Sequence, residues 1–71
     1  MTADRTIPDP LTERERSVLR FLCTNLSGKE IADELCISIH TVRTHQAAIY
    51  RKLSARDRRD AVRHARSFEL I

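Results

Sequence analysis

Apolar residues recur along the chain at spacings of three and four, in four segments that polar stretches separate. Such spacing places side chains on one face of an α-helix, whereas a strand would show strict alternation. The pattern therefore predicts an all-α protein, with Phe68, Leu70 and Ile71 closing one end of its core. The apolar positions are Val18, Leu19, Leu22 and Leu26, then Ile31, Ala32 and Leu35, then Val42, Ile49 and Leu53, and last Ala61, Val62 and Ala65.

Each apolar segment begins with a helix-capping signal, in which a short polar side chain precedes the helix and an acceptor follows three residues later. The signals are Thr12 with Glu15, Ser27 with Glu30, Ser38 with Thr41, and Asp57 with Asp60, an acidic variant. We therefore predict a four-helix bundle with helices over residues 12–24, 27–35, 38–53 and 57–67. Asn25 is expected to end the first helix in a left-handed conformation.

The second and third predicted helices are separated by only Cys36 and Ile37. Two helices joined by so short a turn form a helix-turn-helix, so this motif is expected at the centre of the bundle. The second helix of such a pair can project from the body and lie in a DNA major groove, which is ~12 Å wide.

The 71 residues allow a single domain and leave no room for a two-lobed active site. We interpret residues 1–10, with Pro8 and Pro10, as a flexible tail that is disordered to about Ile7, and residues 11–71 as the domain. No stretch approaches the ~20 apolar residues of a membrane helix. We expect a cytoplasmic, nucleoid-associated protein without a membrane partner.

The formal net charge of +3 conceals two unlike halves. Residues 1–38 carry five Lys and Arg against seven Asp and Glu, whereas residues 39–71 carry eight against three. A basic half of this kind favours a polyanionic partner, although an ordinary solvated helix face has the same composition.

The predicted third helix turns a distinctive set of side chains away from its apolar stripe. His40, Thr44, Ala47 and Arg51 lie opposite that stripe with Arg43 on the flank, and residues 38–56 contain no acid. An arginine can fork onto guanine O6 and N7, while threonine and alanine methyls can contact the methyl of thymine. The alternative interpretation is a basic helix face that is merely exposed to solvent.

Several motifs resemble the LuxR/GerE-type DNA-binding domain of bacterial transcription regulators, over Leu11 to about Leu70. They are LTERE at 11–15, VL at 18–19, LSGKEIA at 26–32, LCIS at 35–38, TVRTH at 41–45, IYRKL at 49–53 and RRDAV at 58–62. The resemblance implies a four-helix domain that binds double-stranded DNA with its third helix, as a dimer on an inverted repeat. It places base reading on Arg43, Thr44 and Ala47, and phosphate contacts on Lys29, Ser38, Thr41, His45, Arg51 and Lys52.

The chain also departs from the family pattern. Gln46 replaces an apolar residue, so we expect it to be half-buried with its amide hydrogen-bonded. Ala47 replaces a common Lys or Arg, which limits base reading there to a thymine methyl.

In the family the fourth helix is the dimerisation element, which here places Arg59, Val62, Arg63 and Arg66 at the candidate dimer surface. Two arginine-rich faces would repel each other across a two-fold axis. We therefore expect a homodimer through residues 57–67 on DNA and a monomer or very weak dimer off DNA. RNA polymerase is a further candidate partner.

Other chemistries find little support. His40, His45, His64 and Cys36 form no closed ligand set, so no metal is expected, and no catalytic set or cofactor motif can be assembled. Cys23 and Cys36 are expected to be buried free thiols. Glu15, Lys52 and Arg58 are expected to join the helices through ion pairs rather than to touch DNA.

The sequence thus predicts a non-enzymatic, sequence-specific DNA-binding output domain of a bacterial transcription regulator. Its sensory domain is expected to lie outside these 71 residues, and the alternative is a free-standing regulator. The alternative is a basic helical protein-interaction module that recognises an acidic partner.

Overall fold

The structure, a computed structural model, describes residues 10–70. The predicted disordered tail to Ile7 and the predicted core position of Ile71 lie outside the described residues. Four helices and no strand make up the described part, which confirms the all-α prediction. They are α1 (Glu13–Leu22), α2 (Gly28–Leu35), α3 (Ile39–Leu53) and α4 (Arg58–Ser67).

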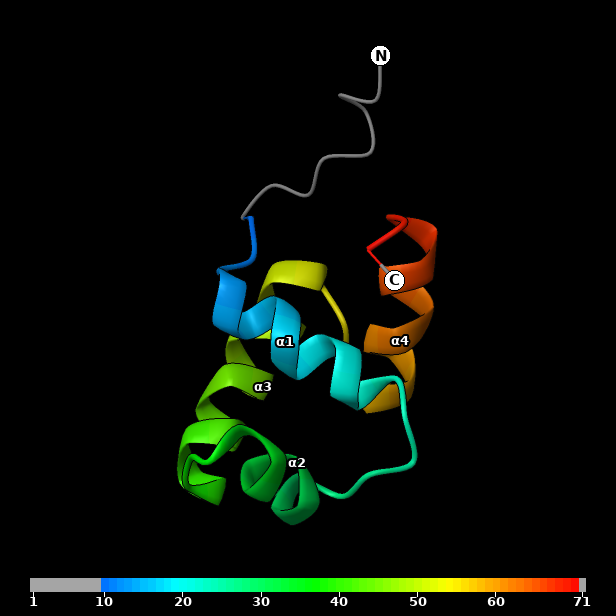
Figure 1. Ribbon diagram of the computed structural model, residues 1–71. Coiled ribbons are helices and arrows are strands. Elements are labelled where there is room, and N and C mark those ends of the chain that lie inside the picture. The colour runs from blue at the N-terminus through cyan, green and yellow to red at the C-terminus, as the bar shows by residue number, and fades with distance from the viewer. Residues whose placement is uncertain (1–9, 71) are drawn as a thin grey trace.

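Helix α3 is the central element of the bundle because it packs against each of the other three helices (Figure 1). The core contains Val18, Leu19, Leu22, Ile31, Ala32, Val42, Ile49, Leu53, Ala61 and Ala65, all of them predicted, and also Leu11. Leu35 is half-buried and packs at the edge of the core, and Val62 is half-buried without being part of it. Nearly every apolar position that the helical spacing selected therefore faces the core.

The N-terminal caps form as predicted at α1, α2 and α3, where the caps are Thr12, Ser27 and Ser38. Thr12 and Ser27 each accept a hydrogen bond from the backbone N–H three residues on, and the glutamate there reaches back to the cap, completing both capping boxes. At α4 only half of the predicted box exists. The Asp57 carboxylate accepts from the Asp60 N–H at 2.8 Å, but the Asp60 carboxylate accepts from the Arg56 N–H instead. The side chain of aspartate is one methylene shorter than that of the glutamate in the other two boxes, which explains why the Asp60 carboxylate does not complete the box at Asp57.

The prediction that Asn25 ends the first helix in a left-handed conformation is wrong. Helix α1 ends two residues earlier than predicted, at Leu22, and its C-cap Cys23 has φ −84°. Left-handed residues occur at Cys36, Ser54 and Glu69. The prediction that the helix ends at residue 24 did not include a tertiary contact at this position. Arg58 donates hydrogen bonds to the carbonyls of Leu22 and Thr24 at 2.9 and 2.8 Å.

The turn between α2 and α3 is closed by its own backbone. Cys36 adopts φ 58°, and the Ile37 N–H donates to the Ala32 carbonyl at 3.0 Å, which is the bond pattern of a helix ending in a left-handed residue. Ser38 then caps α3. A three-residue turn, Cys36 to Ser38, therefore sets the angle at which α3 leaves α2, as a helix-turn-helix requires.

Candidate nucleic-acid interface

One side of α3 is anchored in the core and the other is open to solvent. Val42 and Ile49 on the inner side are fully buried. The five predicted outward residues, His40, Arg43, Thr44, Ala47 and Arg51, are all exposed. Because the whole inner stripe is buried, the helix presents these five residues at fixed positions on one surface, which we term the α3 face.

The hydroxyl of Thr44 is already used within its own helix. Its Oγ1 donates to the His40 carbonyl at 3.1 Å, one turn earlier. The hydroxyl proton is therefore committed, and the γ-methyl and the oxygen lone pairs are what Thr44 has left for a ligand. Ala47 lies one turn further along the exposed side and carries only a methyl, so the middle of the α3 face is largely apolar between Arg43 and Arg51.

The start of α3 carries hydroxyl groups and one exposed apolar residue. Ser38 Oγ accepts from the Thr41 N–H at 3.0 Å and lies 2.9 Å from Thr41 Oγ1. The adjacent Ile39 is 38% exposed, the one exposed large apolar side chain among residues 10–70. The sequence interpretation missed Ile39, although its position next to the Ser38 cap and outside the apolar stripe was a usable signal.

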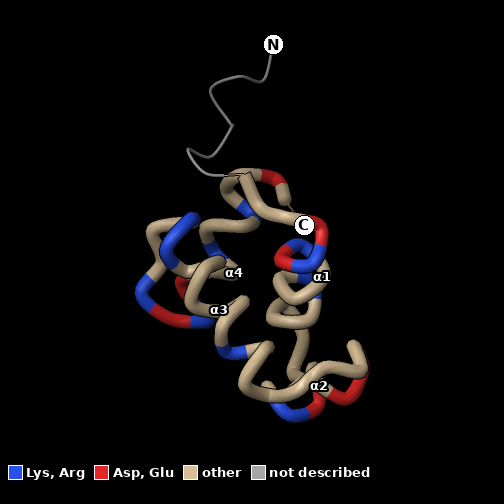
Figure 2. The backbone as a smooth tube through the Cα atoms, turned by 90° about the vertical axis from the view of Figure 1, so that its left-hand side faces the viewer, with Lys and Arg blue, Asp and Glu red and all other residues tan. Residues whose placement is uncertain are grey.

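The remaining predicted phosphate-binding residues differ in their accessibility. Lys29 at the second position of α2 is exposed, as is Arg51, whereas His45 is half-buried. Gln46, outside this set, is half-buried as predicted. Figure 2 shows Lys and Arg positions on α3, and both basic and acidic positions on α2 and α4. The α3 face is therefore the part of the helix-turn-helix with basic groups and no acid of its own.

Lys52 is engaged elsewhere. Its ammonium lies 2.7 Å from Glu15 Oε1 and 3.3 Å from the Pro10 carbonyl, and its side chain is only 15% exposed. Burial alone would raise the pKa of Glu15, but the hydrogen bond from Lys52 and those from Thr12 outweigh it, so the pKa lies below its ordinary value. The expected Glu15–Lys52 ion pair between α1 and α3 is confirmed, and it draws Lys52 away from the phosphate set.

Arg58 does not join that ion pair, contrary to expectation. Its guanidinium donates to the carbonyls of Leu22, Phe21 and Thr24 at 2.9, 3.3 and 2.8 Å. The last carbonyls of a helix lack partners within the helix, so a guanidinium is well suited to cap them. Arg58 thus fixes the end of α1 to the start of α4.

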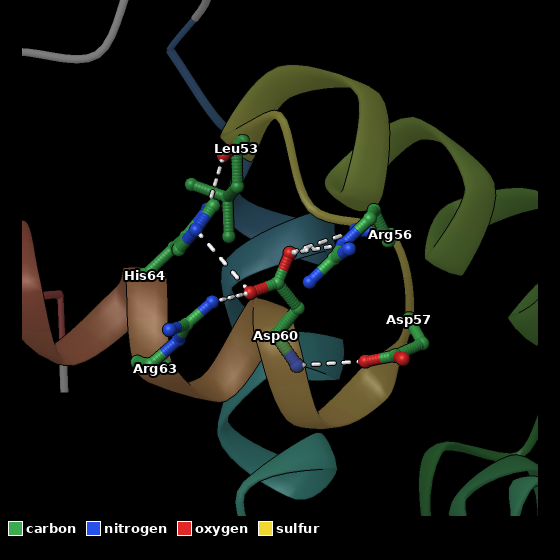
Figure 3. Close-up of polar contacts among 6 residues, drawn as sticks. All are labelled: Leu53, Arg56, Asp57, Asp60, Arg63 and His64. Carbon is green, nitrogen blue, oxygen red and sulfur yellow. Dashed lines mark hydrogen bonds and ion pairs between the residues drawn. The ribbon is translucent and has the colours of Figure 1, made fainter.

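One arginine of α4, Arg63, pairs with a buried carboxylate that the sequence did not single out as a site. Asp60 is 7% exposed. It accepts hydrogen bonds from the Arg63 guanidinium and, at 3.0 Å, from the Arg56 N–H, and its Oδ1 lies 3.4 Å from His64 Nε2 (Figure 3). Hydrogen bonds from Arg63 and Arg56 lower the pKa of Asp60 to about 2.

His64 extends this cluster to α3, because its Nδ1 donates to the Leu53 carbonyl at 2.6 Å. Arg59, Arg63 and Arg66 are exposed and Val62 is half-buried, and we term these four residues the α4 face. Arg63, in the middle of the α4 face, is thus paired with Asp60, whereas neither arginine of the α3 face is ion-paired with an acid of residues 10–70.

The two cysteines are free thiols, as predicted, but neither is part of the buried core. Cys23 is half-buried, and burial raises the pKa of its thiol. Cys36 is exposed, because the left-handed turn directs it out of the bundle. Among residues 10–70, no three His, Cys, Asp or Glu side chains converge as metal ligands would, and no helix there has the length and apolarity to span a membrane.

Four helices, a three-residue turn between the second and third, and an exposed third helix define a helix-turn-helix domain. Comparisons with known proteins agree. Residues 9–65 match the family model "Bacterial regulatory proteins, luxR family", GerE. The chain is 40% identical over 62 residues to the fimbriae Z protein of Salmonella typhimurium, covering 87% of this chain and 30% of that relative.

A solved structure is similar throughout. The crystal structure of the response regulator ChrA from a heme-sensing two-component system aligns with a TM-score of 0.85 and 38% identity, over 93% of this chain and 33% of that one. This chain therefore spans about a third of the length of these relatives. The chain belongs to the luxR family of bacterial regulatory proteins. That family consists of transcription regulators rather than enzymes.

Proposed function

We propose that this domain binds double-stranded DNA in a sequence-specific manner, as the output domain of a bacterial transcription regulator, with α3 in the major groove. The observation that carries the proposal is the α3 face, on which Arg43, Thr44 and Ala47 are exposed together while the inner side of the helix is locked in the core. Membership of the luxR family supports it. This role places the protein with the nucleoid in the cytoplasm and makes RNA polymerase a candidate partner.

Each base-reading residue has a definite chemical role in this proposal. Arg43 donates two hydrogen bonds to guanine O6 and N7. Thr44 and Ala47 place their methyls against thymine methyls, since the Thr44 hydroxyl proton is committed to the His40 carbonyl. Phosphate oxygens are bound by Lys29, Ser38, Thr41, His45 and Arg51, with Lys52 left out because of its pairing with Glu15.

On DNA we propose a homodimer through α4, with Val62 at its centre, and in free solution a monomer or very weak dimer. The exposed arginines of the two α4 faces would approach each other across the two-fold axis, and the buried Asp60 compensates only part of that charge. Sedimentation at low micromolar concentration tests this, and a tight dimer there would contradict it.

The central experiment selects binding sites from a random duplex pool and measures affinity for the preferred site over a range of salt. Several phosphate contacts predict a steep fall in affinity as salt rises, together with a defined half-site. Salt-sensitive binding without any enriched sequence would refute specific recognition while leaving non-specific DNA binding in place.

The methyl contacts have their own test. Replacing thymine by deoxyuridine in the half-site removes one methyl and should weaken binding by about 0.8 kcal/mol, the free energy of burying one such group. Thr44→Ser keeps the hydroxyl and removes the protein methyl, so it should make binding insensitive to that replacement, whereas Thr44→Val should stay sensitive. Equal sensitivity in both variants would show that Thr44 reads no thymine.

A further inference from the structure

The first residue of α3, Ile39, is exposed although its side chain is large and apolar. Ile37, two residues earlier, packs against the core, whereas Ile39 lies outside it. An acid in the first turn stabilises a helix, and α1, α2 and α4 each have one, but α3 has none. A branched side chain also loses rotamer freedom in a helix. Neither the core nor the helix therefore accounts for an isoleucine at this position.

Helix α4 leaves Ile39 uncovered. It is hydrogen-bonded to the far end of α3, where His64 donates to the Leu53 carbonyl. Ile39 and Leu53 are the first and last residues of the helix, which places them about 21 Å apart along its axis. In Figure 1 the first turn of α3 lies beside α2 at the lower left of the bundle, away from α4. A homodimer through the α4 face would therefore leave Ile39 open to a ligand.

Ile39 begins a row of exposed side chains that continues along α3. Ile39, Arg43 and Ala47 are four residues apart and all exposed, so each lies one turn beyond the last and about 40° around the helix from it. Ile39 thus precedes Arg43 by about 6 Å along the axis. That distance corresponds to one or two base pairs at ~3.4 Å each. Because the N-terminal residues of a recognition helix contact base edges, a duplex on the α3 face would reach Ile39.

The chemistry of Ile39 restricts what it can contact on such a duplex. Its side chain has no hydrogen-bonding group, so it cannot bind a phosphate, and the hydroxyls of Ser38 and Thr41 beside it supply the polar contacts at this end. In the major groove the apolar group of a base pair is the C5-methyl of thymine. A branched side chain in a helix keeps one preferred χ1 rotamer, so holding it against that methyl costs little further entropy.

We propose that Ile39 is a specificity-determining residue, which contacts the methyl of a thymine one or two base pairs from the guanine bound by Arg43. The inference rests on the proposed binding of DNA by α3 and adds a base-reading residue to it. The two residues with methyls on the α3 face follow Arg43 along the helix, whereas Ile39 precedes it. The half-site therefore carries an A·T pair on each side of the G·C pair that Arg43 contacts.

The test replaces each thymine of the selected half-site by deoxyuridine, one at a time. Fluorescence anisotropy then gives the affinity of the unaltered chain, of Ile39→Ser and of Ile39→Val for every duplex. Loss of a buried methyl should weaken binding of the unaltered chain about fourfold. At one thymine Ile39→Ser should lose this sensitivity, whereas Ile39→Val, which keeps a branched apolar side chain, should retain most of it.

Two controls separate base contact from folding and from net charge. Ile39→Ser alters an exposed residue without changing charge, so it should keep the melting temperature of the chain and bind an unrelated duplex within about twofold of it. Thr44→Ser is the matched variant on the α3 face and should become insensitive at a different thymine, while Ile39→Ser stays sensitive there.

Three outcomes would overturn the inference. If Ile39→Ser were as sensitive as the unaltered chain at every thymine, DNA recognition by α3 would stand without Ile39, which would then be available to a protein partner. Equal weakening on preferred and unrelated duplexes would mean that Ile39 supports docking without selecting a base. If the unaltered chain enriched no half-site, the proposed function and this inference would fail together.

Discussion

Helices α3 and α4 both present arginines to solvent, but their surroundings differ. On the α3 face, Arg43 and Arg51 stand beside methyl groups, and residues 38–56 contain no acid. On the α4 face, Arg63 is paired with the buried Asp60, and Arg59 and Arg66 border a cleft between the end of α1 and α4. The comparison shows that counting charge does not identify a binding surface, since the neighbours of each guanidinium decide whether it supports the fold, reads a ligand or does both.

Lys52 and Arg51, adjacent on α3, provide the strongest test of this distinction. Lys52→Met should lower the free energy of unfolding by about 3 kcal/mol, because it leaves Glu15 buried without its ammonium partner. Arg51→Ala on the exposed side should change it by less than about 0.5 kcal/mol. Urea denaturation measures both values. Similar losses in the two variants would mean that the ion pair between α1 and α3 is not what matters at this end of the helix.

Arg43→Ala compared with Arg66→Ala tests the two faces against each other in DNA binding. On a duplex carrying one preferred half-site, Arg43→Ala should cost about 1–3 kcal/mol and relax specificity at one base pair. Arg66→Ala removes the same charge and should change affinity less than about twofold. Fluorescence anisotropy on matched duplexes gives both numbers, and equal losses would assign DNA binding to net charge.

Lys29→Ala should have a smaller and more uniform effect. A lysine bound to a phosphate contributes to every duplex alike, so the variant should weaken specific and unrelated duplexes by the same factor. It should also reduce the slope of log affinity against log salt by about one. An effect confined to the preferred site would instead make Lys29 a base-reading residue.

Acid titration probes the cluster beneath the α4 face. The pKa of Asp60 is about 2 in the folded chain, against an ordinary value of 3.8. The unfolded state therefore binds the proton first, and the contribution of Asp60 to stability is complete above about pH 4 and is lost as the pH falls towards 2. Melting temperatures at constant ionic strength should fall over this range.

The control for the acid titration is Asp60→Asn. This variant should melt lower at neutral pH and change less between pH 4 and pH 2, while the lowered pKa of Glu15 contributes a decrease of the same sign in both proteins. An unchanged acid profile in Asp60→Asn would show that the cluster does not stabilise α4.

Helix positions and the core followed from local patterns. The capping boxes at Thr12 and Ser27 and the stripe of Val42, Ile49 and Leu53 are where the spacing predicted them. These features depend on residues three or four apart, whose contact is guaranteed once a helix forms. The exposure of Arg43, Thr44 and Ala47 followed for the same reason, since burying one side of a helix exposes the other.

The wrong end predicted for α1 has the opposite origin, because it involves a partner far away in the chain. Helix α1 ends at Leu22, and Arg58, from another helix, binds its last carbonyls. The exposure of Cys36 is a separate case. The left-handed turn that directs Cys36 outward is closed by backbone hydrogen bonds to Ala32 and Asp33, and the helical period of the apolar residues does not predict it.

The amino-acid order was therefore sufficient for four helices, their inward sides and the residues available on the third, since those properties come from local hydrogen bonds and helical period. Packing the helices together was needed to pair Lys52 with Glu15 and to place Arg58 on the carbonyls at the end of α1. The free energy of a charged side chain depends on which distant groups surround it, and folding is what brings those groups within reach.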